Sequence, residues 1–139
     1  MNRFEISFNA KLENISIMRN IIAGFLINKN VTISFIDEVK TIASEAITNS
    51  IVHGYKENED GIIKCIIELN DEKIIMHFID NGEGIENIEE AKKPLFSTKK
   101  DEERSGLGFT IMEIFSDEMQ VISRVGEGCR VIIHKKFDS

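Results

Sequence analysis

One stretch of the sequence, from Asp37 to Tyr55, restricts the possible folds of this chain more than any other. Apolar residues recur at the spacing of an amphipathic helix, beginning with Ile36 just before the stretch and continuing with Val39, Ala43, Ala46 and Ile47. Glu45, Asn49 and His53 lie four residues apart, so they form a polar stripe along the border of this apolar face. A carboxylate, an amide and an imidazole at the rim of a core indicate either a functional site or a helix edge that is merely polar.

The composition is that of one ordinary domain, which we expect to span residues 1–139. Of the 139 residues, 42% are hydrophobic, which is enough for one sizeable core. No apolar run approaches the roughly 18 residues of a membrane span, and the N-terminus lacks a signal-peptide pattern, so we expect a cytoplasmic protein. The net charge of −7 disfavours binding to nucleic acid and to anionic membranes, and suits a partner with a basic surface. Cys65 and Cys129 lie in no metal-binding spacing and fit reduced thiols.

Periodicity and turn signals predict the other elements. Strands are predicted at residues 3–8, 62–69, 73–79, 119–125 and 130–137. Besides the long helix, helices are predicted at residues 14–28, 86–91 and 106–115. Asn14 is the expected N-cap of the first helix, and Thr32 or Ser34 that of the long helix. The main order, β-α-α-β-β-α-β-β with hairpin connections, predicts an α+β fold: a two-layer sandwich in which a mostly antiparallel sheet carries helices on one face.

A glycine-containing motif, Asp80-Asn-Gly-Glu-Gly, follows directly after a predicted strand. Such a motif is common in turns. Gly82 and Gly84 would also allow a ligand to approach the backbone closely. The Asp80 carboxylate could then accept a hydrogen bond from an exocyclic amine such as that of adenine.

A second glycine motif opens the predicted helix at residues 106–115, after an irregular, charged loop. The bare amides of Gly106 and Gly108, together with the positive end of the helix, would suit phosphate groups. Lys99, Lys100 and Arg104 lie just upstream and would add positive charge. We expect this loop to order around bound phosphates, although a flexible, solvated loop end is the alternative interpretation.

Taken together, the motifs resemble the ATP-binding fold shared by gyrase, Hsp90, histidine kinases and MutL, the Bergerat fold. Glu45 to Gly54 matches the first box of that superfamily, Asp80 to Ile85 the second and Gly106 to Gly108 the third. The resemblance extends over nearly the whole chain and implies that the protein binds ATP with Mg²⁺. It also implies that Asp80 recognises adenine and that the glycines of the third box hold phosphates.

The resemblance gives roles to further residues. Mg²⁺ takes oxygen ligands, and the Asn49 side chain can supply one. Glu45, one turn earlier, can take or orient the proton of an incoming serine hydroxyl. Arg104 matches the lid arginine of the family, which can reach the γ-phosphate or a partner. Cys129 stands where the family usually has a threonine near adenine and is a weaker hydrogen-bond partner. His53 is expected to pack at the helix end.

Within the superfamily, residues 44–55 and 94–113 are most similar to the small bacterial anti-sigma serine kinases, and above all to the sporulation anti-sigma F factors, the stage II sporulation AB proteins. This resemblance implies a homodimer that holds sigma F inactive. It further implies that the protein uses ATP to phosphorylate a serine of the anti-anti-sigma protein AA. Three alternatives stay open: a stress-response anti-sigma kinase with another sigma factor, a binding-only anti-sigma module that uses ATP structurally, and a standalone histidine-kinase catalytic domain.

Arg19 lies in a helix that is apolar on two sides. One side carries Ile17, Met18, Ile21 and Phe25, and the other carries Leu12, Ile15, Ile22, Ala23 and Leu26. We expect the side led by Ile17, Ile21 and Phe25 to pack on the sheet, which would leave Arg19 exposed in an apolar patch that binds a partner. The resemblance agrees, because Arg19 falls on a family arginine that contacts both the sigma factor and the anti-anti-sigma protein. The alternative is an arginine that snorkels across the core edge to an acidic neighbour.

Overall fold

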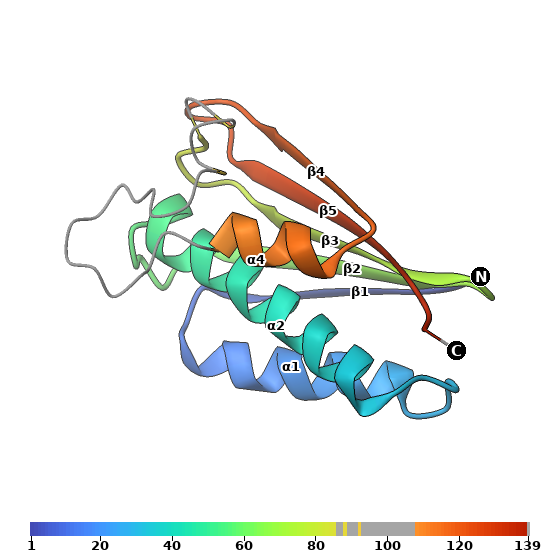
Figure 1. The fold of residues 1–139 in the computed structure, drawn as a ribbon. Helices are drawn as coiled ribbons and strands as arrows, with labels where there is room; N and C mark the ends of the chain where they lie inside the picture. The colour runs from blue at the N-terminus through green and yellow to red at the C-terminus, as the bar shows by residue number, and fades with distance from the viewer. Residues whose placement is uncertain (86–87, 89–91, 93–107, 139) are drawn as a thin grey trace.

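The computed structural model describes residues 1–85, 88, 92 and 108–138, and its elements follow the predicted order (Figure 1). The strands are β1 (Asn2–Asn9), β2 (Ile62–Leu69), β3 (Lys73–Asp80), β4 (Glu118–Ser123) and β5 (Cys129–Lys136). The helices are α1 (Glu13–Leu26), α2 (Ile33–Asn49) and α4 (Gly108–Phe115), and a π-helical turn, η1 (Ser50–Gly54), continues α2. The predicted short helix at 86–91 and the charged loop at 92–105 lie almost entirely outside the described residues.

The strands form one five-stranded sheet in the order β1-β2-β3-β5-β4, and every neighbouring pair is antiparallel. Along β3 the side chains alternate, so that Ile74, Met76, Phe78 and Asp80 are buried while the residues between them are half-buried. The three helices lie on one face of the sheet (Figure 1). The predicted fold class, an α+β sandwich with an antiparallel sheet, is therefore confirmed.

The core lies between the helices and the sheet, and α2 contributes most of its helical side. The buried residues of α2 repeat at helical spacing: Phe35, Val39, Ile42, Ala43, Ala46 and Ile47. Facing them are the alternating buried residues of β2 and β3, among them Ile63, Ile67 and Met76. Complete burial of one large aliphatic side chain stabilises the fold by about 1.5–3 kcal/mol, which explains why the long helix has a fixed orientation on the sheet.

The two predicted helix caps have different outcomes. Thr32 caps α2, because its hydroxyl accepts a hydrogen bond from the Phe35 amide at 3.1 Å. The prediction for Asn14 is wrong: Leu12 occupies the N-cap position of α1, and it makes no side-chain capping bond. The Asn14 side chain instead donates to the Asn9 carbonyl oxygen at 2.8 Å and so fastens α1 to the end of β1.

The predicted orientation of α1 is only partly correct. Its buried residues, Met18, Ile22 and Leu26, come from both of the predicted apolar sides. Phe25 packs as expected, since its ring stacks on that of Phe4 in β1 with 4.3 Å between centroids. Ile17 is 51% exposed, which contradicts its predicted packing. α1 packs against α2, and its Phe25 reaches β1, so the residues buried on α1 come from both predicted sides. Among the described residues, no helix has the length and hydrophobicity needed to cross a membrane.

Candidate functional site

The site is built where α2 passes into η1. The sequence predicts a single regular helix up to Tyr55, but the last turn, Ser50–Gly54, is a π-helix. A π-turn holds one more residue than an α-turn and therefore changes the direction in which the following side chains point. Ser50 is buried here, and its hydroxyl donates to Asp80 Oδ2 at 2.7 Å. His53 lies in the same turn and is half-buried.

Asp80, at the end of β3, is a buried carboxylate held by three donors. The amide of Gly82 donates to Oδ1 at 2.9 Å, the Ser50 hydroxyl donates to Oδ2, and the backbone of Cys129 supplies the third bond. Burial raises the pKa of Asp80 above its usual value, and the three hydrogen bonds oppose that rise because they stabilise the charged form. A fixed, buried acceptor of this kind can select a ligand that donates a hydrogen bond.

The glycines of this motif pack against the chain itself. A Cβ atom at Gly82 would lie 2.2 Å from the carbonyl oxygen of Gly54, and the neighbouring Glu83 amide donates to that same oxygen at 2.8 Å. Gly84 has a φ of +78°, and a Cβ there would lie 2.0 Å from the Arg124 carbonyl oxygen. Only glycine can therefore hold the loop after β3 against η1 and the end of β4. Figure 1 shows the end of β3, η1 and the beginning of α4 at the same end of the molecule.

Glu45 and Asn49 face the beginning of α4. A Cβ atom added at Gly108 would lie 3.5 Å from Asn49 Nδ2 and 3.8 Å from Glu45 Oε2. The structure thus brings together three residues that the sequence motifs predicted to share a site. The positive end of the α4 dipole lies at Gly108, so this position favours negatively charged groups.

Asn49 has the features expected of a metal ligand. Its Nδ2 atom is buried and has no hydrogen-bond partner within the described part of the chain. A half-turn of the amide would put the side-chain oxygen, a ligand that Mg²⁺ accepts, in that place. Residues 1–85, 88, 92 and 108–138 contain no cluster of three or more His, Cys, Asp or Glu side chains suited to a metal ion. A metal beside Asn49 would therefore need oxygens from a ligand as well, and the residues present fit Mg²⁺ bound with a nucleotide.

Three predicted site residues, Lys99, Arg104 and Gly106, lie outside the described residues. Cys129 does lie at the site, because the register of β3 and β5 pairs it with Asp80. Burial raises the pKa of the Cys129 thiol to about 12, and the charge of Asp80 acts in the same direction. Cys129 is therefore a neutral thiol beside the carboxylate.

Sequence reasoning missed Ser50 and Tyr55. The Tyr55 hydroxyl accepts a hydrogen bond from the Asn81 amide at 2.8 Å and donates to the Ile62 carbonyl oxygen, so it joins the end of η1 to both β2 and the Asp80 motif. It is the only tyrosine in the chain, which was the one available signal. Ser50 lies three and four residues after Ile47 and Ala46, on the buried face that helical spacing predicts, but its hydrogen bond to Asp80 joins residues 30 positions apart, which periodicity does not reveal.

Arg19 lies against α2. Its Nη1 atom donates to Ser44 Oγ at 2.6 Å and to the Lys40 carbonyl oxygen at 3.3 Å. The side chain is half-buried, which differs from the exposed position expected, and these two bonds are made to neutral groups rather than to an acidic neighbour. The hydroxyl of Ser44, the residue before Glu45, thus holds the guanidinium against α2.

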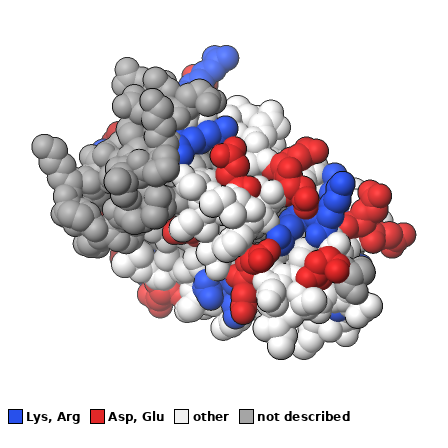
Figure 2. Space-filling model, viewed as in Figure 1, with Lys and Arg blue, Asp and Glu red and all other residues white. Residues whose placement is uncertain are grey.

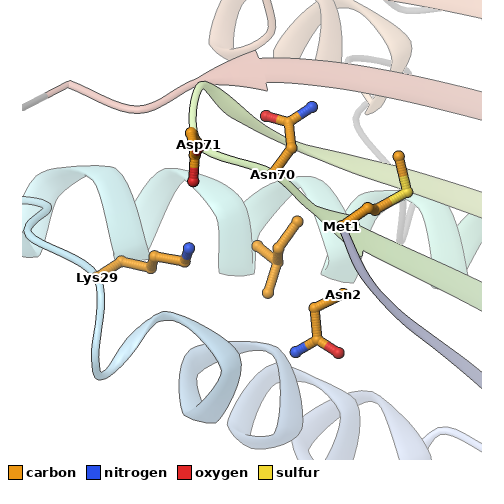
Figure 3. A pocket seen from close by; sticks show the side chains of 6 residues that line it. Met1, Asn2, Lys29, Asn70 and Asp71 are labelled. Carbon is orange, nitrogen blue, oxygen red and sulfur yellow. The ribbon is translucent and has the colours of Figure 1, made fainter.

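A small pocket of about 290 Å³ lies at the other end of the sheet, near the chain termini (Figure 3). It is lined by Met1, Asn2, Lys29, Leu69, Asn70 and Asp71. Because Asp71 precedes β3 and Asp80 ends it, this pocket and the site described above lie at opposite ends of the same strand.

On the side that carries the helices, Asp and Glu side chains are interspersed with Lys and Arg (Figure 2).

Comparison with known proteins agrees with this geometry. Residues 8–135 match the family model described as a histidine kinase-like ATPase domain. An anti-sigma F factor from Clostridium beijerinckii is 45% identical over 137 residues, which cover 99% of this chain and 96% of that protein. One from Clostridium botulinum is 44% identical with the same coverage.

A solved structure shares the fold at low sequence identity. It contains the RsbU and RsbW domains of a Mycobacterium tuberculosis protein and superimposes with a TM-score of 0.70 at 17% identity. The match covers 99% of this chain but only 33% of that one. The likeness at this identity therefore concerns the fold alone.

Proposed function

This chain belongs to the anti-sigma F factor family of histidine kinase-like ATPase domains, and from that membership we propose that it binds and inhibits sigma F and phosphorylates a serine of an anti-anti-sigma protein with ATP. The observation that carries the enzymatic part is the position of Gly108 beside both Glu45 and Asn49. An anion-binding helix end, a metal-ligand amide and a carboxylate meet there. Phosphoryl transfer needs little more from a protein, because positioning and charge neutralisation provide most of the catalysis.

In this proposal the nucleotide extends from Asp80 to the beginning of α4. Asp80 accepts a hydrogen bond from the exocyclic amine of adenine, and the amide at the start of α4 binds a phosphate oxygen. Asn49 is the side chain that would hold Mg²⁺. When bound with the nucleotide, Mg²⁺ neutralises charge on the phosphoryl group. Lys99, Arg104 and Gly106 are proposed to complete the phosphate contacts, as in the family pattern.

Glu45 is proposed to act on the substrate serine. As the serine oxygen forms a bond to the γ-phosphorus and the bond from that phosphorus to the bridging oxygen breaks, the hydroxyl proton passes to the Glu45 carboxylate. Asn49 and Gly108 keep the phosphate side in place. Because Glu45 lies on the same helix face one turn before Asn49, it is positioned to serve transfer more than nucleotide binding.

The proposed partners are sigma F, the anti-anti-sigma protein AA as substrate, and a second copy of this chain in a homodimer. Arg19 is the side chain proposed to contact both other proteins, held in place by Ser44. Phosphorylation assays with different anti-anti-sigma proteins distinguish this proposal from a stress-response kinase. The absence of any transfer would favour a binding-only module.

Glu45→Ala tests the transfer step. We expect the variant to bind Mg-ATP normally but to phosphorylate protein AA more slowly by ~10²-fold or more, the usual effect of removing a general base. Transfer is measured with labelled ATP, and binding is measured by calorimetry. Asn49→Ala is the comparison variant, since it should weaken both. Wild-type transfer rates in Glu45→Ala would refute the proposed role.

Asp80→Asn tests adenine recognition. The change keeps the size of the side chain but replaces an acceptor-only group with one that also donates. We expect ATP affinity to fall at least tenfold while the thermal unfolding temperature stays the same or rises, because a buried charge is removed. Calorimetry and thermal unfolding measure the two effects. A folded variant with unchanged ATP affinity would contradict the assignment.

A further inference from the structure

The ladder between β2 and β3 ends one pair short of a hydrogen bond that its own pattern predicts. The register of the two strands is regular as far as the pair formed by Ile63 and Asp80. At the hairpin turn, the Asn70 amide donates to the Lys73 carbonyl oxygen at 3.2 Å. Hydrogen-bonded pairs alternate with non-hydrogen-bonded pairs along an antiparallel ladder. Counted from the turn, the pair beyond Asp80 would therefore be a hydrogen-bonded one.

The hydroxyl of Tyr55 takes the place of that bond. The pair in question would be Ile62 and Asn81. The Asn81 amide donates to Tyr55 Oη at 2.8 Å, and the hydroxyl in turn donates to the Ile62 carbonyl oxygen. The ring fits here because Gly61 has no side chain, since a Cβ atom at that position would lie 2.5 Å from Tyr55 Cγ. One hydroxyl group thus separates β2 from the residue that follows Asp80.

The next two residues of this loop are held against the end of η1. Gly82 packs so closely on the Gly54 backbone that a Cβ atom would not fit, and the Glu83 amide donates to the Gly54 carbonyl oxygen at 2.8 Å. The Gly82 amide also donates to Asp80 Oδ1 at 2.9 Å. Gly54 lies against the same carboxylate, because a Cβ atom there would lie 3.1 Å from Asp80 Oδ1. The carboxylate is therefore oriented by the loop that Tyr55 anchors.

The turn after Tyr55 has an uncommon backbone conformation. Lys56 and Glu57 have φ values of 52° and 65°, in the left-handed region that residues with a side chain seldom adopt. The Glu57 amide donates to the Ile51 carbonyl oxygen at 2.8 Å, which ties the turn back to η1. Such conformations persist where surrounding contacts enforce them, and they are frequent at binding sites. The chain thus adopts a costly turn directly after the residue that anchors the loop.

We propose that Tyr55 is a positioning residue for nucleotide selection: its hydroxyl replaces a ladder bond, directs the loop after β3 toward η1, and so orients the Asp80 carboxylate toward the exocyclic amine of adenine. This inference rests on the proposed function, in which Asp80 recognises adenine. Without the hydroxyl, the Asn81 amide and the Ile62 carbonyl both need a partner, and the nearest solution is a direct bond between them. That bond extends β3 by one pair and draws the loop away from η1.

Tyr55→Phe tests this role, because it removes the hydroxyl and keeps the ring. Calorimetry compares ATP with inosine triphosphate, which carries an oxygen in place of the exocyclic amine. We expect the wild type to prefer ATP and the variant to lose at least about fivefold of this preference, as for one weakened hydrogen bond. The KM for ATP should rise, while kcat at saturating Mg-ATP stays within about twofold, because Glu45 and Asn49 are positioned by α2.

A second variant and a matched control accompany this test. Gly61→Ala displaces the hydroxyl without removing it, since the added Cβ atom collides with the ring. It should lower the preference for ATP as Tyr55→Phe does, and it decides the question if Tyr55→Phe does not fold. Lys56→Met is the control, because it removes only an exposed ion pair with Glu83 in the same loop, and such a pair contributes little. Thermal unfolding shows which variants are folded.

The outcomes separate this inference from the proposed function. An unchanged preference for ATP in a folded Tyr55→Phe or Gly61→Ala variant would overturn the role of Tyr55 and leave the adenine assignment standing. An equal loss of affinity for both nucleotides would also overturn it, since a purely structural residue has that effect. In an Asp80→Asn background, Tyr55→Phe should change the preference no further, because its effect passes through that carboxylate. A wild type that does not distinguish the two nucleotides would refute adenine recognition by Asp80 itself.

Discussion

At the scale of single residues, the three hydrogen-bond donors to Asp80 differ in kind. Gly82 and Cys129 donate from the backbone, and only Ser50 donates from a side chain. Burial raises the pKa of Asp80, and the Ser50 hydroxyl opposes this rise by stabilising the charged carboxylate. Ser50 is therefore the partner whose removal changes the protonation of Asp80 without changing the fold of the loop.

We predict that Ser50→Ala makes ATP binding more sensitive to acid. Without the hydroxyl, the pKa of Asp80 rises further, and the protonated carboxyl loses its acceptor-only character. ATP affinity should therefore begin to fall at a higher pH than in the wild type as the pH is lowered. Calorimetric dissociation constants between pH 5 and 8 measure this, with Ser34→Ala, at an exposed serine, as the control. Superimposable pH profiles would show that Ser50 does not control Asp80.

At the scale of elements, a buried lysine holds α4 in place. Lys135 is 8% exposed, and its ammonium donates to Glu38 Oε1 at 2.8 Å and to the Phe115 carbonyl oxygen at 2.6 Å. Phe115 ends α4, so the positive charge lies at the negative end of the helix dipole. The other end of the same short helix lies at Gly108, beside Asn49. One contact in the core thus helps to fix the position of the proposed phosphate site.

We predict that Lys135→Met lowers the free energy of unfolding by about 1–3 kcal/mol, because the Phe115 carbonyl and the Glu38 carboxylate lose their buried donor. Urea unfolding measures the loss. Lys136→Met is the control, since Lys136 is exposed and lies next in the chain. A stability equal to that of the control variant would show that α4 is held by apolar packing alone.

At the scale of the whole molecule, the proposed functions occupy different surfaces. The nucleotide site lies at one end of the sandwich, and Arg19 belongs to α1, which lies in the helix layer (Figure 1). Leu12, an exposed apolar side chain, lies two turns before Arg19 on the same side of the helical region. An arginine with apolar neighbours is the composition typical of residues that dominate binding energy.

We predict that Arg19→Glu weakens sigma F binding by about 2 kcal/mol or more, an effect of the size found for dominant interface residues. ATP affinity should stay unchanged, since the hydrogen bonds of the guanidinium in the described structure go to Ser44 and the Lys40 backbone. Affinity for sigma F is measured by calorimetry, with Arg19→Lys and thermal unfolding as controls. If partner binding falls only as far as stability does, Arg19 has a structural role.

The sequence by itself was sufficient to predict the secondary-structure elements and the types of residue at the candidate site. Strand alternation, the spacing of the apolar residues in α2 and the glycine motifs are local patterns, and each depends on a few neighbouring residues. They were enough to predict the antiparallel sandwich, the Thr32 cap and the shared location of Glu45, Asn49 and Gly108. The resemblance to the ATPase superfamily followed from these same motifs.

Only the tertiary structure decided how these parts meet. The hydrogen bond of Ser50 to Asp80 and that of Arg19 to Ser44 join segments that are separate in the sequence, and the bond of Asn14 to Asn9 depends on how β1 meets α1. The exposure of Ile17 is a further example, because α1 packs against α2 and the sheet at once and its periodicity cannot tell which stripe will be buried. Such contacts depend on the packing of whole elements, which the local pattern of any one element does not contain.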